Sequence, residues 1–307
     1  MSISNNHKSI VSKKLRTKWY GTIVLLATFC LSVFFGIQPI YGQEIKVLTF
    51  NIRFDNPADG INAWPHRVPL VTSYLQATKA DIVGVQEALH HQVLELETIL
   101  EGYTRVGTGR GDGRESGEFS PVFFRNDKFE LIDHGQFWLS LTPEVPGSIG
   151  PCAVLPRITT WAHLRIKANG KSIFVFNTHF CHMNDEARWY SARFMSEKMK
   201  EIAGEKPMIV TGDFNQNINS ETYQKIAELF LSENQLKNAV KLHITPEQKS
   251  DGTFNAFRYT EDQPFIDYIF VSPRFTTTDS AIHKVMQNGV FISDHWPVVL
   301  TIYMDYQ

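Results

Sequence analysis

The chain has 307 residues, of which 43% are hydrophobic and 20% are charged. This length and composition are ample for a sizeable core and suit one large domain or two small ones. The formal net charge of −2 excludes the basic excess that proteins holding long nucleic acids by their phosphates usually show.

The first 42 residues differ from the rest of the chain. Four basic residues within 13–18 precede an uncharged apolar run over 19–37, and Gly42 supplies a small residue for a cleavage site. This order is typical of a secretory signal, so we expect residues 1–42 to direct export to the periplasm or the medium. The apolar run approaches the ~20 residues that span a bilayer, so an uncleaved N-terminal membrane anchor is the alternative.

Loss of this leader would change the charge of the protein. Residues 1–42 contain five Lys or Arg and no Asp or Glu, which leaves 25 basic and 32 acidic residues, a formal net charge of −7. Residues 43–307 therefore carry no strong electrostatic signature of nucleic-acid binding. Because no segment indicates an obligate protein partner, we expect a monomer.

Short β-rich runs alternate with helical stretches over residues 43–307, and no internal repeat or flexible linker divides them. Several runs are uniformly apolar, as is typical of strands covered on both faces. The expected strands span 45–54, 81–86, 121–125, 129–139, 159–166, 172–180, 207–211, 265–271 and 297–303. The expected helices span 65–78, 91–100, 186–202 and 221–231, the last with Ser220 as its N-cap. This mixture predicts a single domain of sheets with helices packed on their outer faces.

Polar side chains repeatedly occur where an apolar strand ends. Six such segments contain Asn51, Gln86-Glu87, Asn177-Thr178-His179, Asp213-Phe214-Asn215, Asp267 and Asp294-His295. One such residue alone is commonly a satisfied polar strand end. Six together, all with oxygen or nitrogen donors, predict a polar and acidic cleft that needs a cation or protons to be stable.

Two cysteines, Cys152 and Cys181, follow the leader. An exported protein can keep a disulfide, so these two could pair. The sequence does not require their Cα atoms to be close, and two unpaired buried thiols are the other interpretation. A cysteine metal site is not indicated, because no CxxC spacing occurs.

Two segments carry a family resemblance, Gly212-Asp213-Phe214-Asn215 and Ser293-Asp294-His295. With Gln86-Glu87 and Asn177-Thr178-His179 before them, the chain resembles the endonuclease/exonuclease/phosphatase superfamily, which has the DNase I-like fold, over residues 48–298. The resemblance implies an α/β (α+β) fold, a four-layer αββα sandwich of two packed mixed β-sheets with helices on the outer faces. It also implies a metal-dependent hydrolase that acts on phosphate esters.

The resemblance assigns roles to matching positions. Its metal-site positions correspond to Asn51, Glu87 and Asp294. Its catalytic positions correspond to His179, Asp213, Asn215, Asp267, His295 and Glu118. Its phosphate-contacting positions correspond to Arg157, Asn215 and His179.

Within that set the resemblance implies separate tasks. Asp213 and Asn215 would orient the nucleophile and contact the phosphate, while His295 would handle a proton with Asp267 as its oriented partner. Glu118 would be the carboxylate that positions the second histidine, His179. The sequence leaves open which of these groups is the general base.

Oxygen donors from one or two carboxylates and an amide suit Mg²⁺, which keeps several of its waters when bound to proteins. Mn²⁺ is an alternative because its preferred ligands overlap with those of Mg²⁺. A zinc site would more often use cysteines or several histidines, and the chain has neither an HExxH nor a CxxC pattern.

These observations predict an exported, Mg²⁺-dependent phosphoesterase that hydrolyses a phosphodiester or phosphomonoester by metal-assisted in-line attack of water. The candidate substrates are nucleic acid (DNA or RNA), phospholipid headgroups as in a sphingomyelinase, and small phosphorylated sugars or nucleotides. The net charge of −7 favours a small phosphorylated substrate. A non-catalytic binding protein on the same scaffold is the alternative of a different class. Such a protein would be expected to lack metal or histidine positions, and none of the principal ones is missing.

Overall fold

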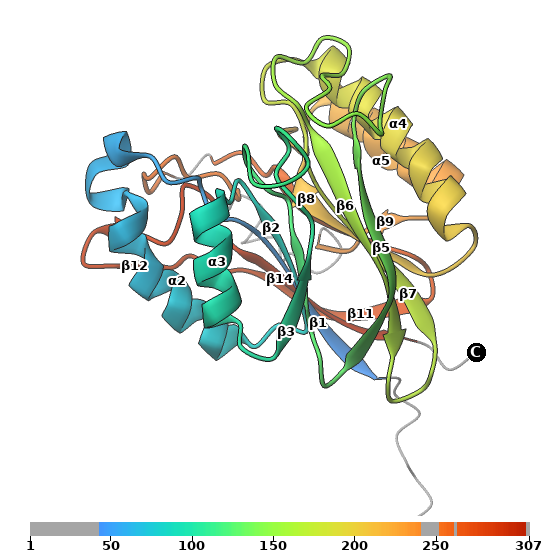
Figure 1. Cartoon of the computed structure of the whole chain (residues 1–307), viewed down its shortest axis with the longest axis horizontal. Helices are drawn as coiled ribbons and strands as arrows, with labels where there is room; N and C mark the ends of the chain where they lie inside the picture. The colour runs from blue at the N-terminus through green and yellow to red at the C-terminus, as the bar shows by residue number, and fades with distance from the viewer. Residues whose placement is uncertain (1–42, 241–251, 261–262, 305–307) are drawn as a thin grey trace, which may run out of the picture. The chain divides into compact units, whose positions relative to one another are not determined.

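Two mixed β-sheets dominate the protein (Figure 1). The first has the strand order β11-β14-β1-β2-β4-β3, in which β1 and β2 are parallel and all other neighbours are antiparallel. Its strands are β1 (Glu44–Asn51), β2 (Ile82–Gln86), β3 (Tyr103–Val106), β4 (Val122–Arg125), β11 (Phe275–Ile282) and β14 (Val298–Met304).

The second sheet repeats this arrangement, with the order β5-β6-β7-β8-β10-β9 and β7 parallel to β8. Its strands are β5 (Phe129–Trp138), β6 (Ile158–Ile166), β7 (Ser172–His179), β8 (Met208–Asp213), β9 (Lys237–Asn238) and β10 (Asp267–Val271). A separate pair joins β12 (Met286–Gln287) to β13 (Val290–Phe291).

The computed structural model describes residues 43–240, 252–260 and 263–304. The predicted leader lies outside these residues, so its export and anchor interpretations both stay predictions. Within the described ranges, no helix is long and apolar enough to cross a membrane.

The alternation of side chains along each strand determines the layers. On β1, Leu48 and Phe50 pack with α2 (Trp64–Thr78) and α3 (His90–Ile99), whereas Val47 points into the apolar layer between the sheets. Figure 1 shows α2 and α3 on one side of the sheets and the other two long helices on the opposite side.

Those two helices are α4 (Asp185–Ala203) and α5 (Glu221–Asn234), which cover the second sheet. Phe230 of α5 meets Phe270 of β10 with ring centroids 5.2 Å apart. The predicted four-layer αββα sandwich is therefore confirmed. A short 3₁₀ helix, η1 (Pro57–Asn62), leads into α2.

All nine expected strands and four expected helices are present, with ends shifted by a few residues. β1 stops at Asn51 rather than at residue 54, because Arg53 adopts a left-handed backbone with φ of 58°. Ser220 caps α5 as expected, since its side chain accepts a hydrogen bond from Tyr223 N over 3.1 Å. The strands that the sequence analysis missed are β3, β9, β11, β12 and β13.

The two cysteines do not pair in the structure. Cys152 and Cys181 are both free thiols, and only Cys181 is buried. The disulfide interpretation is therefore wrong, and the alternative of two buried thiols is wrong for Cys152. The Cys152 thiol instead donates to Glu186 Oε2 over 3.3 Å.

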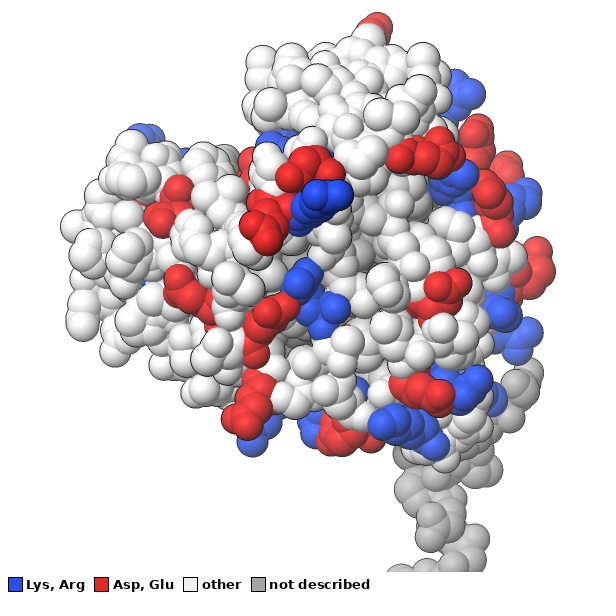
Figure 2. Space-filling view, in the orientation of Figure 1, with Lys and Arg blue, Asp and Glu red and all other residues white. Residues whose placement is uncertain are grey.

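Charged side chains of both signs are dispersed over one face of the described part of the chain (Figure 2). On the face shown in Figure 2, Lys and Arg lie among Asp and Glu rather than in an extended stripe of one sign. Many charged side chains of the described residues form exposed ion pairs, such as Arg165 with Glu130. This face therefore lacks the basic track that a long polyanion would follow.

Candidate active site

Both sheets are apolar along most of their facing surfaces and polar at one edge. On β1, Val47 lies in the apolar layer and Asn51 lies at the polar end; on β8, Ile209 and Asp213 occupy the corresponding positions. Side chains on one face recur every second residue, so the two strand ends bring Asn51 and Asp213 together. Asn51 Nδ2 donates to Asp213 Oδ2 over 3.0 Å.

A buried polar network joins the two sheets beneath this edge. Gln86 Nε2 donates to Asn177 Oδ1 over 2.7 Å and to Thr49 Oγ1 over 3.1 Å. Thr211 Oγ1 donates to the same Asn177 oxygen over 2.9 Å. A Cβ atom at Gly84 would lie 2.1 Å from Thr211 Oγ1, so only glycine permits this approach. The network therefore sets the separation of the strands that carry the site.

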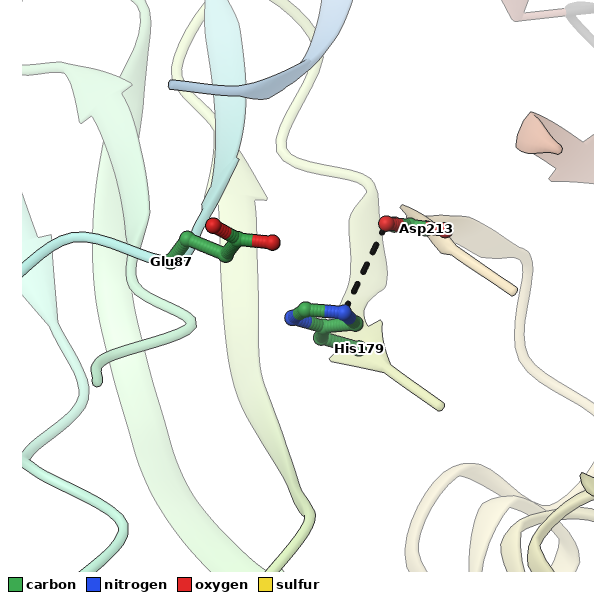
Figure 3. Close-up of side chains that lie close together, drawn as sticks. All are labelled: Glu87, His179 and Asp213. Atoms are coloured by element: carbon green, nitrogen blue, oxygen red, sulfur yellow. Dashed lines mark ion pairs between the residues drawn. The ribbon is translucent and has the colours of Figure 1, made fainter. Parts of the chain in front are cut away.

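Asp213 lies at the centre of the polar edge and is 1% exposed. Its Oδ2 atom lies 3.5 Å from His179 Nε2 and 3.7 Å from His295 Nε2. Figure 3 shows the Glu87 and Asp213 side chains on either side of the His179 ring, and one ligand atom of each lies within 4.8 Å of the others. Burial raises the pKa of Asp213 to about 7, and the nearby Asp267 carboxylate acts in the same direction.

Asp267 orients the His295 ring through its Nδ1 atom. Its Nδ1 atom lies 2.8 Å from Asp267 Oδ2, and Asp267 is the register partner of Asp213 in the next strand. Burial opposes a charge on His295, but Asp267 and Asp213 outweigh it and raise the pKa of His295 to about 10. This contact fixes the ring so that Nε2 faces Asp213.

Glu118 approaches His179 without hydrogen-bonding it. Glu118 Oε2 lies 3.8 Å from His179 Nδ1, which has no hydrogen-bond partner among the residues described. The other oxygen of Glu118 accepts from Arg110 Nη2 over 2.7 Å. Burial lowers the pKa of His179 well below its usual value, and the charges of Arg157 and Arg110 add to this effect. The positioning role expected for Glu118 stays a prediction.

The three expected metal-site residues lie at this same edge. Asn51 Nδ2 donates to Glu87 Oε1 over 3.0 Å. Asp294 lies 3.7 Å from Arg53 Nη1, and burial raises the pKa of Asp294; His295 opposes this shift, while Glu87 adds to it.

Carboxylate and amide oxygens crowded in this way fit a hard divalent cation, which would offset their charge. Two alternative groups share Asp213 and include histidine, namely Glu87 with His179 and Asp267 with His295. The structure therefore brings the expected ligands together. Which of these residues bind the metal and which transfer protons stays a prediction.

Three residues at the site have left-handed backbones. Arg53, Glu87 and Asn215 have φ of 58°, 65° and 50°. This conformation costs about 1–2 kcal/mol for a residue with a Cβ atom, so the surrounding contacts must hold it. At Asn215 they do so directly, because its amide nitrogen donates to Asp213 Oδ1 over 2.8 Å and Nδ2 donates to Phe180 O over 3.1 Å.

Arg67 joins two of the three chain segments that carry the expected metal-site residues, those of Asn51 and Asp294. Its guanidinium donates to the carbonyl oxygens of Ile52 (2.5 Å), Arg53 (3.0 Å), Asn62 (2.6 Å) and Ile292 (3.1 Å). It is completely buried, and burial lowers its pKa to about 10. Its role is therefore structural, because it holds these backbone segments together.

Two further arginines lie at the site, Arg53 and Arg110, and neither is among the site residues that the sequence analysis assigned. Arg53 also pairs with Asp59 over 3.0 Å, and its position two residues after Asn51 at a strand end was the available signal. Arg110, in the glycine-rich segment 107–114, is buried and pairs with Glu118. Nothing in the glycine-rich segment around Arg110 indicated that contact.

Comparison with known proteins agrees with this geometry. Residues 48–295 match the Endonuclease/Exonuclease/phosphatase family. An endonuclease/exonuclease/phosphatase from Bacteroides vulgatus is 38% identical, with 85% of this chain and 99% of that chain covered and a TM-score of 0.78. The mannosyl-6-phosphatase of Bacteroides thetaiotaomicron is 35% identical, with 84% and 99% covered and a TM-score of 0.74.

Curated relatives are more distant and longer. Nocturnin of Drosophila melanogaster is 20% identical over 58% of this chain, and the match spans 29% of that protein. An uncharacterized protein of Acanthamoeba polyphaga mimivirus is 24% identical over 80% of this chain, and that match spans 40% of its length.

Proposed function

The chain belongs to the endonuclease/exonuclease/phosphatase family and is a hydrolase of phosphate esters, and we propose that it is an exported Mg²⁺-dependent phosphatase of small phosphorylated sugars. The observation that carries the chemistry is Asp213, whose Oδ2 atom lies next to both His179 and His295 at the polar edge. The substrate class is supported by 35% identity to a mannosyl-6-phosphatase and by the net charge of −7 for residues 43–307.

The family depends on divalent metals, and we assign the ion to Glu87, Asn51 and Asp294. Their oxygen donors fit Mg²⁺ better than zinc, and Mn²⁺ could replace it. When bound, the ion supplies positive charge that draws electrons from phosphorus and reduces repulsion between the phosphate oxygens and an incoming water.

Asp213 would remove the proton from the attacking water, because the raised pKa of His295 keeps that ring protonated at neutral pH. The positive charge of His295, whose Nε2 atom lies 3.7 Å from Asp213 Oδ2, would stabilise the Asp213 carboxylate. Asp267 holds the His295 ring in place by the 2.8 Å contact to Nδ1. Asn215 and His179 would contact the phosphoryl oxygens, where negative charge grows during attack.

Export is proposed from residues 1–42, with a cleaved signal favoured over an anchor. Cell fractionation and the N-terminal sequence of the protein isolated from its native host test this assignment. A cytoplasmic protein that retains residue 1 would contradict it. The proposed monomer is checked by light scattering of the same preparation.

Hydrolysis assays test the enzymatic proposal. Purified protein is incubated with mannose 6-phosphate, glucose 6-phosphate, p-nitrophenyl phosphate, bis-p-nitrophenyl phosphate, DNA, RNA and sphingomyelin, with Mg²⁺, Mn²⁺ or EDTA. We expect metal-dependent release of phosphate from the sugar phosphates, and loss of several orders of magnitude in Asp213→Asn. Faster cleavage of DNA, RNA or sphingomyelin would refute the substrate class. No metal-dependent turnover of any substrate would favour a non-catalytic binding protein.

A further inference from the structure

Arg53 is a cation held between two carboxylates at the active site. Its Nε and Nη2 atoms donate to the two carboxylate oxygens of Asp59 over 3.0 Å and 3.1 Å. Its remaining nitrogen, Nη1, lies 3.7 Å from Asp294 Oδ2. That distance permits an ion pair but exceeds the length of a hydrogen bond, so Asp59 holds the guanidinium more firmly than Asp294 does.

The left-handed turn at Arg53 also contacts the other two residues to which the ion is assigned. The amide nitrogen of Arg53 donates to Asn51 Oδ1 over 2.9 Å, and the amide nitrogen of Phe54 donates to Glu87 Oε2 over 3.3 Å. The Arg53 guanidinium lies over the Phe54 ring, 4.4 Å from its centroid. The turn therefore holds a positive charge in a defined place beside the expected metal-site residues.

Three cations offset the buried charge of Asp294, namely His295, Arg53 and Arg67. Burial raises the pKa of this carboxyl group, and the three cations oppose the shift. Asp267 holds the His295 ring, and four backbone carbonyl oxygens hold Arg67. The Arg53 side chain is 23% exposed, whereas that of His295 is 4% exposed and Arg67 is completely buried. Arg53 is therefore the cation of this group that has room to move away from Asp294.

We propose that Arg53 supplies the positive charge beside Asp294 until a divalent ion binds, so that the guanidinium and the ion compete for this carboxylate. Asp59 then keeps the displaced guanidinium paired. This inference rests on the ion assignment in the proposed function and adds two residues that set the affinity for the ion. A fixed positive charge beside a cation site lowers its affinity for cations. Without the ion, the same charge limits the cost of burying Asp294 near Glu87.

The test measures the affinity for Mg²⁺ and for Mn²⁺ by calorimetric titration of matched variants. Arg53→Met removes the competing cation, and we expect it to tighten ion binding by about tenfold. Asp59→Asn removes the carboxylate that draws the guanidinium away, and we expect it to weaken ion binding by about tenfold. Arg53→Lys keeps the positive charge and should bind the ion less tightly than Arg53→Met does.

The controls are Arg165→Met and Glu130→Gln, which break an exposed ion pair between β6 and β5. They make the same changes of charge as the test variants do, on residues that no contact joins to the active site. Both controls should bind Mg²⁺ and Mn²⁺ as the parent protein does.

Urea unfolding distinguishes this competition from a folding defect. In EDTA, Arg53→Met should unfold at a lower urea concentration than the parent protein, because Asp294 has lost a counter-charge. Saturating Mg²⁺ should reduce this difference, because the ion then supplies the charge. Ligand linkage requires the reduction to match the gain in affinity, which is about 1.4 kcal/mol for a tenfold change.

Weaker ion binding in both Arg53→Met and Asp59→Asn would show that the turn only positions the ligands, and the proposal would be wrong. Unchanged affinity in Arg53→Met would also overturn it. If Arg53→Met does not fold, Asp59→Asn decides the question, because affinity equal to that of the parent protein would refute the competition.

The proposed function is tested separately by the hydrolysis assays. A parent protein that binds the ion but hydrolyses no phosphate ester would refute the function, while opposite shifts in the two variants would still support the competition. A parent protein that binds neither Mg²⁺ nor Mn²⁺ would refute both the ion assignment and the competition.

Discussion

Gly84 offers a direct test of how the two sheets hold the site. It lies in β2 with ordinary backbone geometry, so alanine would be accepted there if space allowed. The added Cβ atom would lie 2.1 Å from Thr211 Oγ1 and 2.7 Å from Asn177 Oδ1, whereas ordinary contacts begin near 3.4 Å. Gly84→Ala must therefore separate the sheets or turn Thr211 away from Asn177.

Either response has a cost that follows from the contacts. Overpacking of a core costs about 1–3 kcal/mol. Rotation of Thr211 breaks its 2.9 Å hydrogen bond to Asn177 and leaves a buried polar group unpaired, which costs about 1–3 kcal/mol more. We expect Gly84→Ala to lower the free energy of unfolding by about 2–5 kcal/mol. Turnover should fall as well, because Asp213 follows Thr211 by two residues.

The assay is urea unfolding of a double-mutant cycle of Gly84→Ala and Thr211→Ala. Without the threonine hydroxyl the new methyl group meets less obstruction, so the glycine substitution should cost at least about 1 kcal/mol less in that background. Additive effects of the two substitutions, within about 0.5 kcal/mol, would refute the reasoning. So would a Gly84→Ala protein as stable and as active as the parent.

Three further predictions concern buried polar groups. Asp267→Asn should lower kcat by about three to four orders of magnitude, because the amide no longer fixes the His295 ring. Phosphate release measures this, and a loss of less than about tenfold would contradict it. Arg67→Met should lower the free energy of unfolding by about 4 kcal/mol, since four carbonyl oxygens lose their donor. The exposed control Arg165→Met should change it little. Equal urea midpoints for Arg67→Met and the parent protein would rule this out. The pKa of His295 rises from 6.5 to about 10 on folding. Its contribution to the free energy of unfolding is therefore complete below pH 6.5 and is lost as the pH rises through 10. Metal-free protein should therefore become less resistant to urea between pH 6.5 and 10, and His295→Gln should show a flatter profile.

Much of the fold could be predicted from local pattern. Buried strands such as β7 and β8 contain uninterrupted apolar runs, IFVF and MIV, and that signal does not depend on distant residues. The missed strand β11 has the sequence FTTTDSAI and lies at the edge of its sheet. Its half-exposed polar residues resemble a loop, because only pairing with β14 makes it a strand.

The sequence predicts part of the site, because polar residues at the ends of apolar strands indicate a polar edge of the sheets. Asn51, Glu87, His179 and Asp213 all follow or end apolar strands, and the structure brings them together. The sequence could not decide whether Cys152 and Cys181 form a disulfide. Spacing along the chain does not determine distance in space, and Cys152 lies exposed while Cys181 is buried.

The sequence by itself determined which residues could form the polar edge, since apolar alternation followed by a carboxylate, amide or imidazole is a local property. The tertiary structure alone decided which of these residues meet. Asn51 and Asp213 are 162 positions apart, and their hydrogen bond exists only because two sheets pack face to face. The same holds for Arg157 and His182, 25 positions apart, where burial leaves a guanidinium unpaired at the active-site edge. Burial and cross-sheet contacts are set by packing, which local pattern does not contain.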